Sequence, residues 1–419
     1  MTLMSSPDAG WIPAEDAPSG AAWAARWAGI RILYGPGSLA GLGEAARETG
    51  GGHVFLVTDR GVSAAGHVER ALEALRGCAD RVTVFDGVAE NPTTRHVEAG
   101  VAAARSEGAD LLVALGGGSA MDCAKGINFV LTNGGSMERF RGFGHARRPM
   151  LPSIGIPTTA GTGSDAQSYA LIEQEATHVK MACGDRKARF GTVILDPDLT
   201  ATCPRRVAAT SGLDAISHAV ESRVSRAGNP ISHLLSREAW RLLSGAYAAS
   251  LEADADAEVR GRMLLGAHLA GAAVEASMLG AAHACANPLT ARAHALAETA
   301  AGSSADAGLA HGEAVLLMLP HVVRLNAPVA GEAYAGLLAE AAPEAGSSPA
   351  RPESSAESLA ASLEAMRARG GLPARLRDIG VGREELPGLA AAAAEQWTAR
   401  FNPREVTRRD LEDLYAAAW

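Results

Sequence analysis

Asp214 and His218 stand four residues apart in the segment GLDAISHAVE, and their types and spacing suggest a metal site. On a helix, residues i and i+4 lie one turn apart on the same face, so both side chains can reach one cation. A carboxylate oxygen and an imidazole nitrogen are common ligands of divalent metals. The same spacing also occurs in ordinary helix pairs and surface contacts, so a metal site would need further ligands.

The stretch Gly280–His321 is rich in histidine, since it holds four of the 12 in the chain. His283 and His311 lie in apolar segments, which suits either metal ligands or buried neutral histidines with ordinary hydrogen bonds. His321 begins a further helical turn, so we expect a structural role for it. His294 lies in a run of Ala, Gly and Ser, so we expect it to be exposed. The spacing alone leaves open which histidines would complete a site.

Two turns rich in glycine and hydroxyl groups suit a dinucleotide. Gly116–Ser119 follows the apolar run Leu111–Leu115 and precedes a helix-forming segment, so its backbone N–H groups and the helix N-terminus could bind a pyrophosphate. The second turn, Pro157–Ser164, offers hydroxyls and amides for ribose, phosphate and carboxamide groups. Either turn could also be a plain connection, and the GxGxxG motif is absent from the first βα turn.

Asp59 ends the predicted strand His53–Thr58. A carboxylate at the end of such a strand can accept hydrogen bonds from an adenosine ribose and would repel a 2′-phosphate, which favours NAD over NADP. The alternative is an aspartate that only begins the turn into the next helix.

The elements that must position these residues change in type along the chain. In the first half, strands predicted over 28–34, 53–58, 82–85 and 111–115 alternate with helices over about 38–48, 64–77 and 93–107. Further strands are predicted over 153–157, 168–173 and 192–195. This alternation is typical of βαβ units and predicts a doubly wound, Rossmann-like sheet.

After about residue 200 the periodicity is helical, with helices predicted over 207–223, 231–251, 257–278 and 311–325. We therefore expect a dinucleotide-binding α/β domain over 26–203 and a helical metal-binding domain over 204–419. Residues 1–25 are rich in Pro, Gly, Asp and Ser and are expected to form a disordered tail. Two low-complexity segments, about 295–309 and 339–356, are expected to be surface loops.

Composition excludes several classes of protein. A formal net charge of -9 argues against non-specific nucleic-acid binding, which needs a basic face. The five cysteines are scattered without a CxxC pair, which favours free thiols in a reducing compartment. The N-terminus does not resemble a secretory signal, and we expect no membrane-spanning segment. These features predict a cytoplasmic protein.

Seven motifs, in order, resemble the iron-containing (group III) alcohol dehydrogenase family over roughly residues 28–419. They are LVTDRGV, GGGSAMDCAK, IPTTAGTGSD, LDPDLT, SGLDAISHAVES, LGAAHACANPLTA and HGEAVLLMLPHVVRLN. The resemblance implies a dehydroquinate synthase-like architecture, in which an N-terminal Rossmann-like NAD-binding domain precedes a C-terminal all-helical domain. It also implies a metal in the cleft between the domains, and a homodimer.

The resemblance assigns roles to particular positions. It places the metal ligands, and with them the catalytic centre, at Asp214, His218, His283 and His311. It places the dinucleotide contacts at Asp59, Asn91, Gly117, Gly118, Ser119, Thr158, Thr159, Thr162, Lys180 and Leu199.

The chain departs from the family in two places. Asn287 stands where many members carry a second histidine, so a titratable proton relay is lost there. An insert of about a dozen residues, roughly Ala293–Ala307, separates His283 from His311. Loop insertions cost little in closure entropy, so both ligands can still meet if the insert loops outward. If the insert instead displaces the helix that carries His311, the metal loses a ligand.

The predicted activity is reversible hydride transfer between NAD and an alcohol, aldehyde or ketone at Fe(II) or Zn(II). A closer alternative within the superfamily is a reductase of the maleylacetate reductase type. A dehydroquinate-synthase-like lyase would need several Lys and Arg in its helical domain, and residues 204–419 contain no lysine. A third alternative is an inactive homologue without a metal.

Overall fold

The computed structural model describes residues 11–12, 23–27, 29–177, 179–299, 309–341 and 352–419. The chain divides into two compact units, the first Met1–Cys203 with Asp256–Leu265, and the second Pro204–Ala255 with Gly266–Trp419. The second unit therefore differs from the expected helical domain in one segment, Asp256–Leu265, which contains the first turns of helix α8 (Ala257–Ala276).

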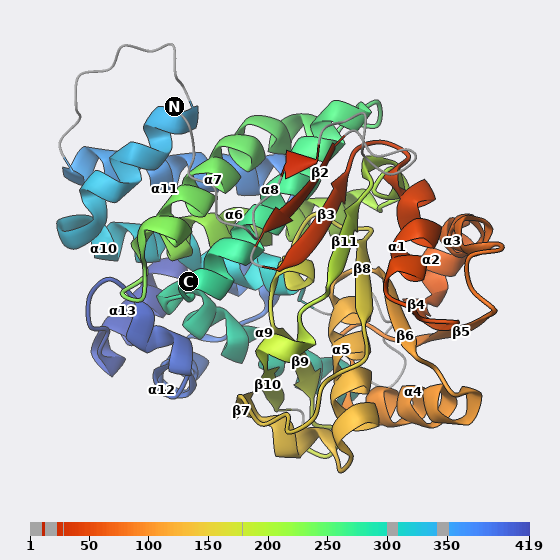
Figure 1. Ribbon diagram of the computed structural model, residues 1–419. Coiled ribbons are helices and arrows are strands. Elements are labelled where there is room, and N and C mark those ends of the chain that lie inside the picture. Colours follow the sequence, from red (N-terminus) through yellow and green to blue (C-terminus); the bar gives the residue numbers. More distant parts are fainter. Residues whose placement is uncertain (1–10, 13–22, 28, 178, 300–308, 342–351) are drawn as a thin grey trace. The chain divides into compact units, whose positions relative to one another are not determined.

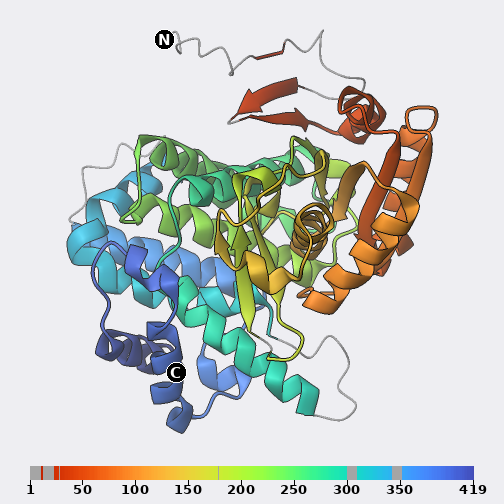
Figure 2. The same ribbon diagram turned by 60° about the horizontal axis from the view of Figure 1, so that its bottom comes forward.

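The first unit is built on an eight-stranded sheet with the strand order β1-β2-β3-β11-β8-β6-β4-β5 (Figure 1). The six strands from β3 to β5 in this order are parallel to one another. Strand β2 pairs antiparallel with β3, and β1 pairs antiparallel with β2. Their bounds are Trp11–Ile12 (β1), Trp23–Trp27 (β2), Ile30–Tyr34 (β3), His53–Asp59 (β4), Arg81–Val88 (β5), Leu111–Gly116 (β6), Ser153–Pro157 (β8) and Thr192–Leu195 (β11). In Figure 2 the red strands β2 and β3 lie near one end of this sheet, and the orange strands β4 and β5 form the other.

Helices cover both faces of the sheet because its strands are apolar on both sides. Alternate residues of β4 show this: Val54 and Leu56 pack with α1 and α3, whereas Phe55 and Val57 pack with α4 and α5. These helices are α1 (Leu42–Glu48), α2 (Arg60–Ala64), α3 (His67–Leu75), α4 (Thr94–Glu107) and α5 (Gly118–Asn133). Burial on both faces is typical of parallel sheets and explains the unbroken apolar run of β6.

A smaller three-stranded sheet with the order β7-β10-β9 adjoins α5. Its strands are β7 (Gly142–Phe143), β9 (Tyr169–Glu173) and β10 (Lys180–Gly184). The predicted α/β class with a Rossmann-like sheet is confirmed.

The second unit contains helices and short 3-10 turns among its described residues. The helices are α6 (Arg205–Val224), α7 (Pro230–Ser250), α8 from Gly266 to its end at Ala276, α9 (Ala281–Thr299), α10 (His311–Ala341), α11 (Pro352–Arg369), α12 (Leu386–Ala394) and α13 (Arg408–Ala418). The long helix α10 packs against α6, α7, α9 and α11 and forms the centre of the helical core.

Helix α10 is also long and apolar enough, over His311–Glu340, to cross a membrane by length and composition. The bent pair Ala257–Ala276 and Ala281–Ala293 passes the same test only if both helices count as one span. In α10, however, 72% of the apolar window is buried inside the structure. Such burial is typical of the core helix of a helical domain, which sequence length and composition alone do not distinguish from a membrane span.

Three expectations need correction within the described residues. Part of the expected disordered tail over 1–25 is ordered, because Trp11–Ile12 pairs with β2, which extends the sheet from β3. The expected loops 295–309 and 339–356 are helical at their ends, since α9 continues to Thr299, α10 to Ala341, and α11 begins at Pro352. Both segments are rich in alanine, the strongest helix former. Residues 1–10, 13–22, 300–308 and 342–351 lie outside the described part.

Candidate metal centre and dinucleotide site

The second unit brings Asp214, His218 and His283 into one buried cluster. Helix α6 carries Asp214 and His218 one turn apart, and the first turn of α9 carries His283. The Oδ1 atom of Asp214 lies 3.6 Å from Nε2 of His218 and 3.6 Å from Nε2 of His283. One ligand atom from each residue lies within 4.8 Å of the other two. The i, i+4 pair on α6 therefore lies next to a histidine from a distant part of the chain.

The chemistry of the cluster fits a divalent cation. Asp214 Oδ1 and His283 Nε2 are buried and have no hydrogen-bond partner among the described residues. Their separation of 3.6 Å is too long for a hydrogen bond between them. Two ligands of a tetrahedral Zn²⁺-like ion, each about 2.0–2.1 Å from it, lie roughly 3.4 Å apart. Buried polar atoms without partners are costly, and a shared cation would satisfy both.

His311 lies beside this cluster at the first residue of α10. Its ring centroid is 5.4 Å from that of His283, which in turn is 5.0 Å from that of His218. The His311 side chain is partly exposed, in contrast to the three buried residues. The insert before α10 therefore does not remove His311 from the neighbourhood of the other three.

An ion pair ties the start of α10 to α6. Arg206 Nη2 donates a 2.8 Å hydrogen bond to Oε2 of Glu313, whose side chain is buried. Because Glu313 is two residues after His311, this bond restrains the position of that histidine near Asp214.

The electrostatics of the cluster favour a positive charge. Burial alone would raise the pKa of Asp214, but the neighbouring imidazoles, His218 first, lower it below its usual value. Burial would lower the pKa of His283, but the carboxylates of Glu221 and Asp214 raise it to about 9. Burial lowers the pKa of His218. Two buried carboxylates thus surround His283, and a cation would be attracted to the same place.

The other predicted histidines do not join the described cluster. His321 lies on α10, where burial first, and then Arg324, lower its pKa. The side chain of His294 lies outside the described part of the chain. Asn287, one turn after His283 on α9, donates a 2.9 Å hydrogen bond from Nδ2 to Oε1 of Gln396.

In the first unit, the two glycine- and hydroxyl-rich turns lie against each other. Gly117 is the N-cap of α5, and a Cβ atom on Gly118 would lie 2.6 Å from Cγ2 of Thr162. A Cβ on Gly117 would lie 3.4 Å from Oγ1 of Thr159. The backbone N–H of Thr158 donates to the Gly116 carbonyl at 2.9 Å. Glycine is therefore needed at Gly118, where any larger residue would collide with the second turn.

Asp59 belongs to the same edge of the sheet. Strands β4 and β6 are neighbours in the sheet. From β4 the chain continues to β5 on one side, and from β6 it continues to β8 on the other side. A topological switch point therefore falls between β4 and β6. Ligands of open parallel sheets bind at such points. Asp59 Oδ1 accepts a 2.9 Å hydrogen bond from Val62 N and so caps α2, and a Cβ on Gly116 would lie 3.4 Å from Oδ2 of Asp59. The aspartate thus begins the helix, as in the structural alternative, and also adjoins the first glycine turn.

The remaining predicted dinucleotide residues are placed as follows. Lys180 Nζ donates a 3.0 Å hydrogen bond to Oδ1 of Asn91, whose φ of 51° is left-handed. Ser119 lies in the first turn of α5 and is partly exposed. Leu199 is fully buried in the core beside α1 and α3, so only its backbone can meet a ligand.

Sequence reasoning missed a buried ion network that joins the two turns. Lys125 Nζ donates to the carbonyl and hydroxyl oxygens of Ser164 at 2.5 and 2.8 Å, and to the Tyr169 carbonyl at 2.8 Å. The Ser164 hydroxyl donates to Oδ1 of Asp122 at 2.5 Å. The signal was present in the segment MDCAKGINFV, where Asp122 and Lys125 interrupt an otherwise apolar helix.

Glu221 was missed as well. It lies on α6 three residues after His218 and seven after Asp214, which places all three on one helical face. Its Oε2 accepts a 2.5 Å hydrogen bond from Nδ1 of His283. The spacing was the available signal, but a glutamate at this position reads equally well as a solvated charge.

A Rossmann-like sheet with paired glycine turns at its switch point, together with a helical unit holding a buried Asp/His cluster, defines a metal-dependent dehydrogenase. The model of the iron-containing alcohol dehydrogenase family matches residues 30–197, and the model of the C-terminal domain of the same family matches residues 208–419. The chain belongs to the iron-containing alcohol dehydrogenase family.

Individual relatives agree with this assignment. The chain is 30% identical over 391 residues to a lactaldehyde reductase of Escherichia coli K12, with 92% of this chain and 97% of that protein covered. Its structure matches that of a 1,3-propanediol oxidoreductase with a TM-score of 0.84 and 30% identity, covering 93% and 97% of the two chains. It matches the NAD⁺ complex of a sulfoacetaldehyde reductase from Bifidobacterium kashiwanohense with a TM-score of 0.79 and 25% identity, covering 92% and 96%.

Proposed function

We propose that this chain catalyses reversible hydride transfer between NAD and a small alcohol or aldehyde, with Fe(II) or Zn(II) as the metal. The observation that carries the proposal is a pair of buried atoms, Asp214 Oδ1 and His283 Nε2, which lie 3.6 Å apart beside His218 and have no hydrogen-bond partner among the described residues. The relatives named for lactaldehyde and for 1,3-propanediol support short hydroxyaldehydes and diols as the first substrates to test.

Asp214, His218, His283 and His311 would hold the metal. When bound there, a divalent cation supplies Lewis acidity, which polarises a substrate carbonyl and lowers the pKa of an alcohol. One hard carboxylate oxygen and imidazole nitrogens suit Fe(II) or Zn(II), and the metal found after purification need not be the native one. Burial of Asp214, His218 and His283 keeps water away from three of the four ligands.

The dinucleotide would be bound by residues of the first unit. The N-terminus of α5 at Gly117, Gly118 and Ser119 offers N–H groups and a partial positive charge to the pyrophosphate. We assign contacts with the rest of the dinucleotide to the hydroxyls of Thr158, Thr159 and Thr162, to Asn91 and Lys180, and to the backbone of Leu199. Asp59 would accept from the adenosine ribose and disfavour NADP.

No residue with the role of a general base is assigned in this proposal. Asn287 occupies the position of the histidine found in many family members, and an amide cannot titrate in the physiological range. The hydrogen bond to Gln396 instead holds this amide in one orientation. The proton exchanged with the alcohol would therefore pass to water.

The state of the protein in the cell is part of the same proposal. The five cysteines are scattered without a CxxC pair, a pattern that favours reduced thiols and a cytoplasmic location. The family resemblance favours a homodimer. No feature of the described residues favours the maleylacetate reductase or lyase alternatives or an inactive homologue.

NADH oxidation tests the proposal. Purified protein is stripped with a chelator, loaded anaerobically with Fe(II) or Zn(II), and assayed with a series of short aldehydes and hydroxyaldehydes. We expect turnover that returns with metal and is lost in His218→Ala. Stoichiometric metal without turnover of any carbonyl, or turnover in the fully stripped protein, would contradict the proposal.

A further inference from the structure

Glu221 uses each of its two carboxylate oxygens for a different bond to α9. Oε1 accepts a 2.8 Å hydrogen bond from the backbone N–H of Ala282, and Oε2 accepts a 2.5 Å hydrogen bond from Nδ1 of His283. The glutamate is buried, with only 4% of its surface exposed. Both bonds are therefore shielded from competing water.

The second bond decides which nitrogen of His283 carries a proton. An ionised carboxylate can only accept, so the bond requires a hydrogen on Nδ1. In the neutral ring this leaves the lone pair on Nε2, the atom that lies 3.6 Å from Asp214 Oδ1 and has no hydrogen-bond partner in the described part of the chain. Once a cation displaces the proton of Nε2, His283 therefore presents that nitrogen to the cluster as a ligand.

We infer that Glu221 is a positioning residue that fixes the tautomer and ring orientation of His283 for metal binding, an inference that rests on the proposed function. Glu221 is not itself a ligand, because its Oε2 bonds the ring nitrogen opposite to the one that faces Asp214. Carboxylates that orient metal-binding histidines in this way typically change metal affinity by about 10–100-fold.

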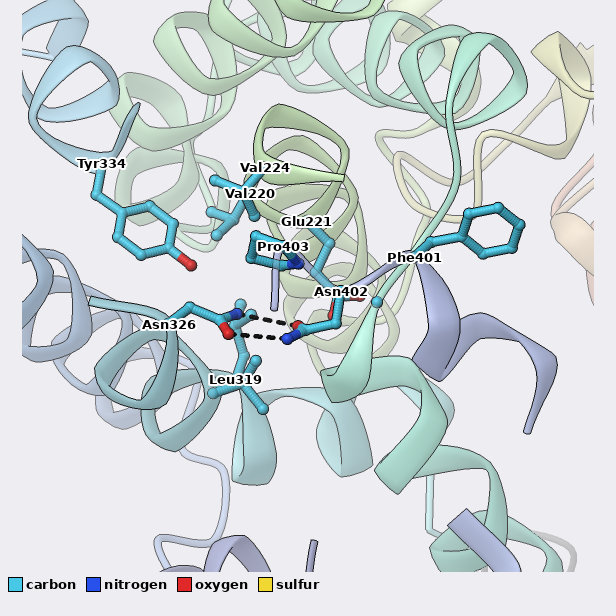
Figure 3. Close-up of a pocket in the computed structure, with 11 residues that line it drawn as sticks. Val220, Glu221, Val224, Leu319, Asn326, Tyr334, Phe401, Asn402 and Pro403 are labelled. Atoms are coloured by element: carbon cyan, nitrogen blue, oxygen red, sulfur yellow. Dashed lines mark hydrogen bonds between the residues drawn. The ribbon is translucent and has the colours of Figure 1, made fainter. Parts of the chain in front are cut away.

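The surroundings keep Glu221 in place. The glutamate borders a cavity of about 10 Å³, which is also lined by Val220, Val224, Leu319, Asn326, Tyr334 and Asn402 among others (Figure 3). This volume corresponds to about one water molecule, so the carboxylate has little room to turn away from His283. Across the cavity Asn326 and Asn402 exchange two hydrogen bonds of 3.0 and 2.8 Å, drawn as dashed lines in Figure 3.

Gly280 completes the enclosure at the start of α9. A Cβ atom on Gly280 would lie 3.0 Å from Glu221 Oε1 and 3.3 Å from Asn402 Oδ1. The absence of a side chain lets the chain pass close to the carboxylate, so that Ala282 and His283 both reach it. The Glu221 carboxylate on α6 is thus enclosed by the start of α9 and by the segment that contains Asn402.

The simpler alternative is that Glu221 only caps α9 through Ala282. Glu221→Gln separates the two roles. The glutamine keeps one oxygen for Ala282 N–H, but its NH₂ group then faces Nδ1 of His283. A donor at that position stabilises the tautomer with its proton on Nε2, which removes the lone pair intended for the metal. A residue that only caps the helix would not change metal affinity in this variant.

The first experiment measures Zn(II) affinity by competition with a chromogenic chelator for the wild type, Glu221→Gln and Glu340→Gln. Glu340 is the matched control, since it lies in the same unit and pairs with Arg237. We expect one Zn(II) per wild-type chain, a 10–100-fold weaker affinity in Glu221→Gln, and no change in Glu340→Gln. Equal affinity in all three would overturn the inference, whereas a wild type that binds no zinc would overturn the proposed function.

The second experiment needs no variant at the glutamate. Nitrogen-15 NMR of histidine-labelled, Zn(II)-loaded wild type, with His283 assigned by its loss in His283→Asn, reports the state of each ring nitrogen. We expect a proton on Nδ1 of His283 and zinc on Nε2. Zinc on Nδ1, or a proton on Nε2, would overturn the role assigned to Glu221 even if the protein binds zinc tightly.

Discussion

Gly312 packs so closely on Thr210 that a Cβ atom at position 312 would lie 2.0 Å from the Thr210 carbonyl oxygen. The same Cβ would lie 3.1 Å from Cβ of Asp214. Glycine at 312 therefore allows the first turn of α10 to lie directly on α6. Since His311 is the preceding residue, this contact sets the approach of the proposed fourth ligand to Asp214.

Gly312→Ala should push the start of α10 away from α6. Overpacking of this kind typically costs about 1–3 kcal/mol, and the displacement of His311 should weaken zinc binding beyond the loss of stability. Chelator competition and thermal unfolding measure the two effects separately. Gly336→Ala is the control on the same helix, because its new Cβ would meet only Arg223 Nη2 at 3.8 Å. Unchanged metal affinity in Gly312→Ala would show that α10 does not position a ligand.

The buried network around Lys125 leads to a second prediction. Lys125→Met should leave the Asp122 carboxylate buried without its cation, together with the carbonyls of Ser164 and Tyr169. Breaking a buried pair typically costs about 3–5 kcal/mol, and loosening of the second glycine turn should also raise KM for NAD. Thermal unfolding and NAD titration provide the measurements.

Lys187→Met serves as the matched control for that experiment. Lys187 pairs with Asp185, but 45% of its side chain is exposed. Asp185 itself is buried, but it also accepts hydrogen bonds from the backbone N–H groups of Ala146 and Lys187, which remain in the variant. Because the exposed ammonium of Lys187 is screened by solvent, this variant should lose much less stability than Lys125→Met. An equal loss of stability in both lysine variants would contradict the role of the Lys125 network.

The fold was predictable where one local signal decided each element. The apolar run Leu111–Leu115 identified a strand buried on both faces, and the alternation with helices identified the parallel sheet. The prediction of a loop over 295–309 was wrong at its start, because α9 continues to Thr299. The low-complexity composition was interpreted as irregular structure, although its many alanines strongly favour a helix.

The site was predictable only in part, for a different reason. The i, i+4 spacing of Asp214 and His218 identified one face of a helix, but their partner His283 is 65 residues further along and only family resemblance assigned it. Glutamate and lysine side chains are usually solvated, so the burial of Glu221 and Lys125 could not be predicted from their positions in the sequence. Tertiary packing decides which atoms these side chains contact, and the spacing of residues along one helix does not reveal that packing.

Asp59 allows a prediction about cofactor choice. Asp59→Asn removes the negative charge but keeps an N-cap, since asparagine caps helices about as well as aspartate. The bond to Val62 N should therefore persist and stability should change little. Loss of repulsion towards a 2′-phosphate should raise the ratio of kcat/KM for NADPH to that for NADH by about tenfold or more, which corresponds to about 1.4 kcal/mol. An unchanged ratio with normal stability would mean that Asp59 only caps α2.

The connection between α9 and α10 provides the last prediction. Residues 300–308 would be replaced by a Gly/Ser segment of equal length, which keeps the closure entropy nearly constant. We expect zinc affinity to stay at the wild-type value, because Gly312 and the Arg206–Glu313 ion pair, rather than the connection, fix the start of α10. Arg206→Ala provides the contrast: loss of the ion pair should weaken zinc binding in a protein whose connection is intact. Weaker zinc binding in the Gly/Ser variant, with normal binding in Arg206→Ala, would instead mean that the inserted residues themselves hold His311 in place.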